Sequence, residues 1–159
     1  MPVPQLDKAR RFRALHEAPG SFVIANVWDG GTARMMESLG FAALATSSGA
    51  SAGTLGCRDG MVTRDEALRQ SRVICDSSDL PVSADLEKGF GDSPSAVAET
   101  IRMAASAGLV GCSIEDATGN PAEPIFELSF AAERIAAAAK SLRSDRSRRE
   151  LSAQPRGPD

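Results

Sequence analysis

The chain has 159 residues, of which 42% are hydrophobic and 25% charged, and its formal net charge is −3. This length suits one domain, and the acidic balance argues against nucleic acid as a partner. No apolar run approaches the roughly 18 residues that span a bilayer, and the first 13 residues lack the apolar core of a signal peptide, so we expect a cytoplasmic protein without membrane contact.

Short apolar runs alternate with segments of helical period along the first half of the chain. A strand is expected over residues 22–25, followed by a helix, and a second strand over residues 42–46. The apolar face of the first helix repeats at i, i+3, i+4 and i+7, which gives Thr32, Met35, Met36 and Leu39. Thr63 is expected to cap the next helix, with Glu66 completing a capping box.

The same alternation continues in the second half. A third strand is expected over residues 81–84, and Ser93 starts a helix that has Pro94 in its first turn. A fourth strand is expected over residues 111–114. The face of the helix that follows is predicted to consist of Leu128, Ala131, Ile135 and Ala138.

Four βα units thus follow one another without a hairpin signal, which predicts parallel strands joined by right-handed crossovers. Two α/β architectures satisfy this pattern. One is a (β/α)₈ barrel, and the other is a small doubly wound binding domain of the flavodoxin or response-regulator type. A receiver domain would need an acidic pair after its first strand, where Asp29 stands alone, and this disfavours the second architecture.

The character of the sequence changes after Lys140. Residues 141–159 contain five arginines, and only two of their aliphatic side chains, both leucines, are larger than alanine. The segment has neither a strand period nor a helix period. We therefore divide the chain into a domain over residues 1–140 and an irregular, disordered tail over residues 141–159.

Polar residues gather directly after the expected strands, where all loops of a parallel fold open on one face. They are Asp29, Ser47, Ser48, Gly49, Asp59, Asp85, Glu87, Glu115 and Asp116. Converging carboxylates repel one another unless a cation neutralises them, and oxygen ligands alone select a hard ion such as Mg²⁺ or Mn²⁺. Taken singly, Asp85 or Glu115 would more often cap a helix or lie in a solvated loop.

Four segments resemble the isocitrate lyase/phosphoenolpyruvate mutase superfamily. Residues 83–91 are similar to its D-x-D-x-G-F/Y-G segment, with Asp85 and Glu87 at the two acidic positions. The other three segments are residues 27–34, similar to D-A-x-S-A-R, residues 48–59, similar to S-G-x…L-G-x-x-D, and residues 111–116, similar to G-x-x-I/L-E-D. The resemblance implies the N-terminal half of a (β/α)₈ TIM barrel.

The resemblance also implies a chemistry. Mg²⁺, or Mn²⁺, would be bound by Asp85, Glu87 and Glu115, with Asp59 nearby as a catalytic acid. A small α-keto or α-hydroxy carboxylate would bind beside the catalytic backbone N–H groups of residues 48–50, which are Ser48, Gly49 and Ala50. A C–C or P–C bond would then break through an enolate. The full-length form of such a lyase or mutase is expected to be a homo-oligomer.

One loop departs from the superfamily pattern. Isocitrate and methylisocitrate lyases carry a cysteine in a K-K/R-C-G-H loop after strand four, and phosphonate mutases carry a lysine in the corresponding gating loop. Residues 117–127 contain no Cys, His or Lys. The chain therefore resembles neither enzyme proper, but a less characterised branch of the superfamily.

The tail suggests why only four units are present, when a barrel needs eight and about 250 residues. With one choice of codons, residues 142–154 read one nucleotide later give F-V-L-T-A-R-A-E-N-F-L-R-N, which resembles the missing fifth strand of this branch. We therefore expect a frameshift near Ser141. The alternative to an active enzyme is then a truncated, non-catalytic product.

Overall fold

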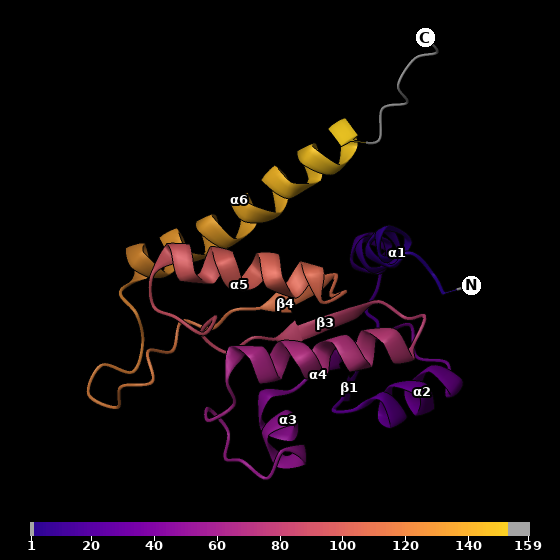
Figure 1. The fold of residues 1–159 in the computed structure, drawn as a ribbon, viewed down its shortest axis with the longest axis horizontal. Helices are drawn as coiled ribbons and strands as arrows, with labels where there is room; N and C mark the ends of the chain where they lie inside the picture. The colour runs from indigo at the N-terminus through magenta and orange to yellow at the C-terminus, as the bar shows by residue number, and fades with distance from the viewer. Residues whose placement is uncertain (1, 153–159) are drawn as a thin grey trace.

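The computed structural model describes residues 2–152, with side chains for residues 2–142. Helices and strands alternate along this part of the chain (Figure 1). In chain order they are α1 (Gln5–Glu17), β1 (Ile24–Val27), α2 (Gly30–Ser38), β2 (Ala43–Thr46), α3 (Ser48–Thr54), α4 (Arg64–Ser77), β3 (Val82–Asp85), α5 (Pro94–Ser106), β4 (Gly111–Ser113) and α6 (Leu128–Ser152). None of the described helices has both the length and the apolar character needed to cross a bilayer.

The strands form one parallel sheet in the order β1-β2-β3-β4. Each described strand therefore lies beside the strand that precedes it in the sequence, and the order never reverses. A doubly wound sheet requires a reversal, whereas a (β/α)₈ barrel adds each strand beside the last. The strand order supports half of a barrel and disfavours the doubly wound domain.

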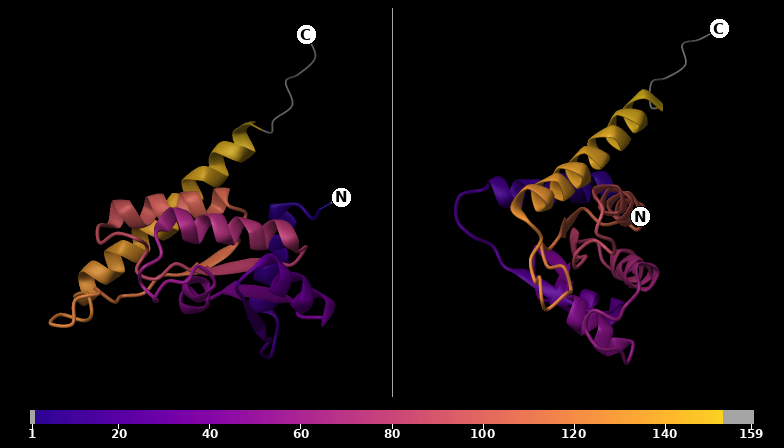
Figure 2. Two further views of the ribbon diagram at one scale, coloured as in Figure 1. Left: turned by 60° about the horizontal axis from the view of Figure 1, so that its bottom comes forward. Right: turned by 90° about the vertical axis from the view of Figure 1, so that its left-hand side faces the viewer.

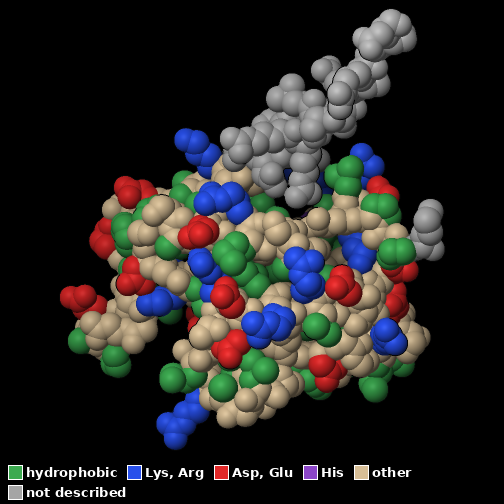
Figure 3. Space-filling model, viewed as in Figure 1, with side chains coloured by type: hydrophobic (Ala, Val, Ile, Leu, Met, Phe, Trp, Pro, Cys, Tyr) green, Lys and Arg blue, Asp and Glu red, His purple; other side chains and the backbone are tan. Residues whose placement is uncertain are grey.

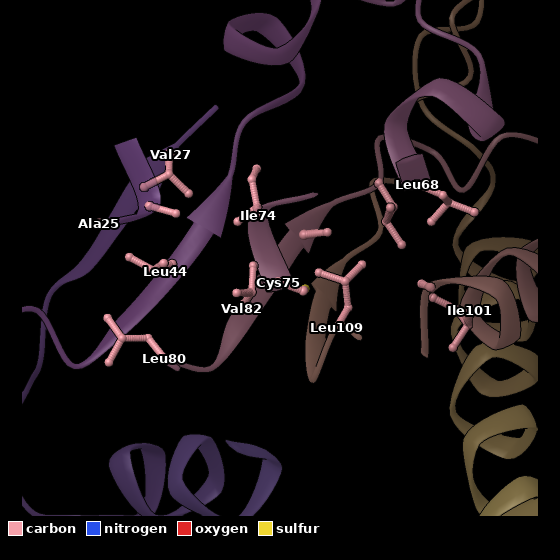
Figure 4. Close-up of a cluster of buried hydrophobic side chains, with 14 of the residues drawn as sticks. Ala25, Val27, Leu44, Leu68, Ile74, Cys75, Leu80, Val82, Ile101 and Leu109 are labelled. Atoms are coloured by element: carbon pink, nitrogen blue, oxygen red, sulfur yellow. The ribbon is translucent and has the colours of Figure 1, made fainter. Parts of the chain in front are cut away.

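One face of the sheet packs against the helices and holds the core (Figure 4). Ala25, Leu44 and Val82 stand in register across β1, β2 and β3, and each is at most 8% exposed. They belong to one cluster with Ile74 of α4 and Ile101 of α5. Burial of these apolar side chains is the main force that holds the helices on the sheet.

The opposite face of the sheet is small and polar. The pairing aligns Asn26, Ala45, Ser83 and Gly111 across the four strands. In a closed barrel this face would line the interior. Within the described chain, β1 and β4 each pair on one side only, so the sheet has two open edges.

Helix α1, which the periodicity did not predict, is attached through polar side chains that reach the ends of two other helices. Lys8 is buried, and its Nζ donates to the carbonyl oxygens of Ser78 at 2.6 Å and Cys75 at 3.2 Å, at the end of α4. Gln5 Nε2 donates in the same way to Ala105 and Leu109, at 2.8 and 2.9 Å, around the end of α5. These contacts satisfy carbonyl groups that a helix C-terminus leaves unpaired.

Replacing Lys8 with methionine should destabilise the fold. The change leaves two buried carbonyl groups without their donor and removes a cation from the negative end of α4, so we expect a loss of about 1–3 kcal/mol in the free energy of unfolding. Urea denaturation followed by circular dichroism measures it. The control is Arg10→Met on the same helix, whose side chain is 68% exposed. Equal stability of the two variants would contradict the role of Lys8.

The last helix differs from the sequence-based expectation in two respects. Its predicted apolar face is wrong in part, because Leu128 is 82% exposed and Ile135 is 48% exposed, whereas Ala138 is buried as expected. Beside Ala138, the buried residues in the described part of this helix are Arg134 and Ser141. The reason is that the Arg134 guanidinium finds backbone acceptors inside the protein, so this charged side chain turns inward.

The second difference concerns the segment expected to be irregular. Helix α6 packs along α5, and its C-terminal end extends beyond the sheet to Ser152 (Figures 1 and 2). Arginine, leucine and glutamate favour helix, and the first proline after Lys140 is Pro155. Residues 153–159 lie outside the described part of the chain, and the domain boundary at residue 140 stays a prediction.

Candidate active site

The predicted site residues all lie at the carboxyl ends of the strands or in the loops that follow. Asp85 is the last residue of β3, Glu87 follows it, and Glu115 follows β4. Ser48, Gly49 and Ala50 form the first turn of α3, and Asp59 lies in the loop between α3 and α4. Because the strands are parallel, the loops that follow β2, β3 and β4 lie at the same end of the sheet, where these strands terminate.

Asp85 connects two of these loops. Its Oδ2 accepts a hydrogen bond of 3.1 Å from the N–H of Ser48, and its Oδ1 accepts one of 3.0 Å from the N–H of Glu87. Its own N–H donates to Oγ1 of Thr46 at 3.0 Å. The carboxylate thus anchors the start of α3, which is the structural role weighed for this residue. Each oxygen keeps a free lone pair for another ligand.

Glu87 has an unusual backbone conformation. Its φ is +49°, and Phe90 in the same loop has a φ of +56°. Such left-handed conformations cost about 1–3 kcal/mol in non-glycine residues and occur mostly where function requires them. The loop is fixed by hydrogen bonds to the next one, since the Glu115 N–H donates to the Glu87 carbonyl at 2.8 Å and the Leu86 N–H donates to Ser113 at 3.3 Å.

The carboxylates influence one another electrostatically. The pKa of Glu87 is raised, first by partial burial and then by the negative charges of Asp59, Asp85 and Glu115, while Lys88 opposes the shift. A charge raises the pKa of another acid in this way only when the two are close. The negative charges of Asp59, Asp85 and Glu115 thus all act on Glu87, and we call these four residues the acidic cluster.

Glu87→Gln should stabilise the metal-free protein at neutral pH. The pKa of Glu87 is higher in the folded chain than its ordinary value of 4.5, so ionisation weakens the fold. This penalty is fully present above the folded pKa and disappears as the pH falls below the unfolded value. In EDTA, we expect the melting temperature of the variant to be higher than that of the wild type at pH 7 and equal to it near pH 4.

The matched control is Glu133→Gln, a change at an exposed position of α6. It removes the same charge away from the cluster and should leave the melting temperature unchanged at both pH values. If the wild type melts at the same temperature as Glu87→Gln at pH 7, or at a higher one, then the ionised Glu87 side chain does not weaken the fold.

The cluster has the donor chemistry of a hard cation. All four groups are carboxylates, which Mg²⁺ and Mn²⁺ prefer. In the part of the chain that the structure describes, however, no three acidic, His or Cys side chains are placed so that together they could hold a metal ion. Mg²⁺ usually keeps several waters and takes one or two carboxylates directly, so the residues fit such an ion.

The structure has a small cavity that is lined by two residues of the acidic cluster and a larger hollow that is not lined by any of them. A small cavity of about 10 Å³, the size of a single water, lies between Asp85, Glu87 and the hydroxyl-bearing Thr46, Ser48 and Ser51. A larger hollow of about 480 Å³ lies between α4 and α5, and none of the four clustered acids lines it. It opens on the outer helical surface, where acidic and basic side chains are interspersed (Figure 3). A substrate that contacts the acids must bind at the open ends of the strands.

Two of the acids noted after the strands lie outside the cluster. Asp29 caps α2, since its carboxylate accepts hydrogen bonds from the N–H and the hydroxyl of Thr32, which lower its pKa. Asp116 does not affect the pKa of Glu87, and its carbonyl group accepts from the N–H of Phe126 at 2.8 Å. Sequence position after a strand was therefore not sufficient to place a carboxylate in the site.

Sequence reasoning missed Arg134, whose guanidinium donates to the carbonyl of Glu115 at 3.1 Å. A signal was present in the sequence, because Arg134 lies three residues after Ala131 and four before Ala138, on the helix face that packs inward. A charged residue at such a position calls for buried acceptors.

A family model described as phosphoenolpyruvate phosphomutase matches residues 12–151. The 2-methylisocitrate lyase of Escherichia coli K12 is 34% identical over 112 residues, which cover 69% of this chain and 38% of that protein.

Solved structures agree with the sequence comparisons. A Burkholderia cenocepacia J2315 protein provisionally named a lyase/mutase superposes with a TM-score of 0.85 at 52% identity, covering 87% of this chain and 50% of that one. A 2,3-dimethylmalate lyase, described as a member of the PEP mutase/isocitrate lyase superfamily, gives a TM-score of 0.78 at 30% identity over 86% and 49% of the two chains. The chain therefore spans about half or less of the length of these relatives.

Proposed function

The chain belongs to the phosphoenolpyruvate phosphomutase family, and on this premise we propose that the whole protein is a lyase or mutase that acts on a small α-keto or α-hydroxy carboxylate. The observation that carries the proposal is the connection of three acidic residues at the ends of β3 and β4, where the Glu87 N–H donates to Asp85 at 3.0 Å and the Glu115 N–H donates to the Glu87 carbonyl at 2.8 Å. Lyases named after 2-methylisocitrate and 2,3-dimethylmalate, both hydroxycarboxylates, are among the similar proteins.

We assign the binding of Mg²⁺, or Mn²⁺, to Asp85, Glu87 and Glu115. When bound, such an ion supplies positive charge that polarises a carboxylate or keto oxygen of the substrate. Asp59 is the fourth acid, and a Cβ added to Gly49 would lie 3.3 Å from its Oδ2. From this position beside α3, Asp59 can accept a hydrogen bond from a substrate hydroxyl.

The first turn of α3 is proposed to bind the developing negative charge. Its backbone N–H groups point away from the helix, and a preorganised N–H group stabilises an oxyanion. Two of these groups already have partners, since the Ser48 N–H donates to Asp85 and the Ala50 N–H donates to Oγ of Ser47. We therefore expect the Gly49 N–H to make the main contact with the substrate.

The direct test uses a whole protein encoded by a gene in which the frameshift that we propose near Ser141 has been reversed. It is assayed against a panel of 2-hydroxy and 2-keto carboxylates, with Mg²⁺ or with excess EDTA. Turnover of at least one of them that EDTA abolishes supports the proposal, and turnover that is indifferent to EDTA contradicts it.

The second candidate, a non-catalytic product, would follow if resequencing the locus showed the frame of residues 141–159 to be genuine. A homo-oligomeric state of the full-length form is proposed on the same family grounds.

We predict that the whole protein does not cleave isocitrate. Residues 117–127, which follow β4 and turn back through a bridge between Ala117 and Ile125, contain no Cys or His to supply the acid of the lyases. Glyoxylate release should stay far below an ordinary enzymatic turnover of ~1 s⁻¹. A rate at or above that value in a coupled glyoxylate assay would show that the thiol is dispensable.

A further inference from the structure

We propose that Arg134 is a positioning residue that holds the loops after β3 and β4 in the arrangement through which their carboxylates bind a divalent cation. The inference rests on the proposed function, because it gives a purpose to the geometry of the same acidic cluster. The side chain lies on α6, outside the four segments whose sequences resemble the superfamily motifs. Arg134 does not belong to the cluster itself and acts through the backbone of the acids.

The Arg134 side chain is 1% exposed, and its guanidinium donates to backbone carbonyl groups of both loops. On the β3 side, Nε donates to Asp92 at 3.0 Å, and Nη2 donates to Gly91 at 3.3 Å and also to Lys88. On the β4 side, Nη1 donates to Glu115 at 3.1 Å. One planar group thus joins two loops that are separate in the sequence.

Arg134 makes no direct ion pair in the described part of the chain. None of the ion pairs found among the described side chains includes it. Carbonyl dipoles surround the guanidinium, and its central carbon lies 4.2 Å from the centre of the Phe126 ring. The negative charges of Asp92 and Asp116 also favour the charged guanidinium, although burial lowers the pKa of Arg134 on balance. A buried cation is costly to place, so its position depends on the loops keeping their present shape, and the loops depend on it in turn.

The contacts act on the residues that carry the carboxylates. Glu115 is held from both sides, because its N–H donates to Glu87 at 2.8 Å and its carbonyl accepts from Arg134 at 3.1 Å. On the other loop, Arg134 binds the carbonyl of Lys88, directly after the left-handed Glu87. A strained residue keeps its conformation only when its surroundings fix it. Arg134 supplies that fixation for Glu87 and sets its distance from Glu115.

Lysine cannot replace this arginine in the proposed role. A guanidinium presents several donors in a rigid plane, whereas an ammonium group is a compact charge on a flexible stem. Arg134→Lys therefore keeps the charge and most of the length but cannot bind both loops with the same geometry. Arg134→Met removes the charge and all donors. Arg102→Met is the matched control, because Arg102 is an exposed arginine of the neighbouring helix α5.

The test uses the full 159-residue chain and two measurements. Hydrogen–deuterium exchange reports the mobility of peptides that cover residues 86–92 and 114–118, and calorimetric titration with Mn²⁺ alone reports affinity. We expect both Arg134 variants to exchange faster in both peptides and to bind Mn²⁺ about 10–100-fold more weakly, the usual effect of losing support behind a ligand. Arg102→Met should match the wild type in both measurements.

The outcomes separate the two proposals. If the wild type binds no Mn²⁺, the proposed metal site is wrong, and the exchange of the two peptides alone decides the role of Arg134. Unchanged exchange in Arg134→Lys, or unchanged Mn²⁺ affinity where the wild type binds, overturns the positioning role. If Arg134→Met does not fold, Arg134→Lys decides. A general loss of stability would speed exchange throughout the chain, so selective exchange in the two loops is the result that supports positioning.

Discussion

Asp85→Ala is expected to lower Mn²⁺ affinity by at least about a hundredfold, and to abolish EDTA-sensitive turnover in the whole protein. Changes behind a metal ligand already cost 10–100-fold, and Asp85 is proposed to bind the ion directly. Its carboxylate also lines the small cavity beside Glu87 and joins that residue to Ser48. Calorimetric titration with Mn²⁺ measures the affinity, and melting in EDTA shows whether the variant is folded.

The structural role of Asp85 needs its own control. Asp85→Asn removes the charge but keeps an oxygen that can accept from the N–H of Ser48 or Glu87, so it should fold and still fail to bind Mn²⁺. Asp29→Ala removes an acid that caps α2 outside the cluster; it should cost about 1 kcal/mol of stability and leave Mn²⁺ affinity unchanged. Wild-type affinity in Asp85→Asn would show that Asp85 only anchors α3.

The 159-residue chain, expressed as it stands, is expected to self-associate and to show little catalysis. In the described sheet, β1 and β4 each leave one row of backbone N–H and C=O groups unpaired, and such edges are templates for pairing with other chains. Val23, just before β1, is 69% exposed. Size-exclusion chromatography with circular dichroism checks the prediction, and a monodisperse monomer that melts cooperatively would contradict it.

A substitution on the open edge locates the cause of association. Cys112 is an exposed residue of β4, and a lysine on an edge strand opposes pairing with another chain. Cys112→Lys should shift the chain toward monomer, whereas Cys112→Ser, which also prevents disulfide formation, should not. The sheet face that would line a barrel is small and polar at Asn26 and Ser83, so we expect the edges to contribute more than this face.

Elements with local signals were predicted well from the sequence. Thr63 and Glu66 form the expected capping box, and Ser93 caps α5 with Pro94 in its first turn. The first strand is shifted to Ile24–Val27, because alternate burial of Ala25 and Val27 decides its position and an apolar run cannot show which residues alternate.

Elements without local signals were missed. Helix α3 consists largely of small residues, so it has no apolar period to detect. The buried side of α2 is formed by Ala33, with the predicted Met36 packed partly against the core, while Met35 and Leu39 of the predicted face are 57% and 66% exposed. A helical period identifies a helix more reliably than it identifies which of two adjacent faces packs inward.

The acidic residues of the candidate site could be predicted from the sequence, but the contacts that hold them in place could not. Asp85, Glu87 and Glu115 lie at or just after the ends of predicted strands. This indicated that they would converge, since the carboxyl ends of parallel strands lie at the same end of a sheet. The left-handed backbone of Glu87 and the carbonyl groups that meet Arg134 depend on how two loops and a helix pack together. No pattern within one segment encodes such an arrangement.

The attachment of α1 has a consequence for the order of folding. Its hydrogen bonds from Lys8 and Gln5 cross between 67 and 104 residues of sequence, and closing a longer loop costs more conformational entropy. The acceptors of Lys8 and Gln5 exist only after α4 and α5 have ended. During synthesis, α1 must therefore wait until α4 and α5 have been made, and it is among the last of the described helices to become fixed.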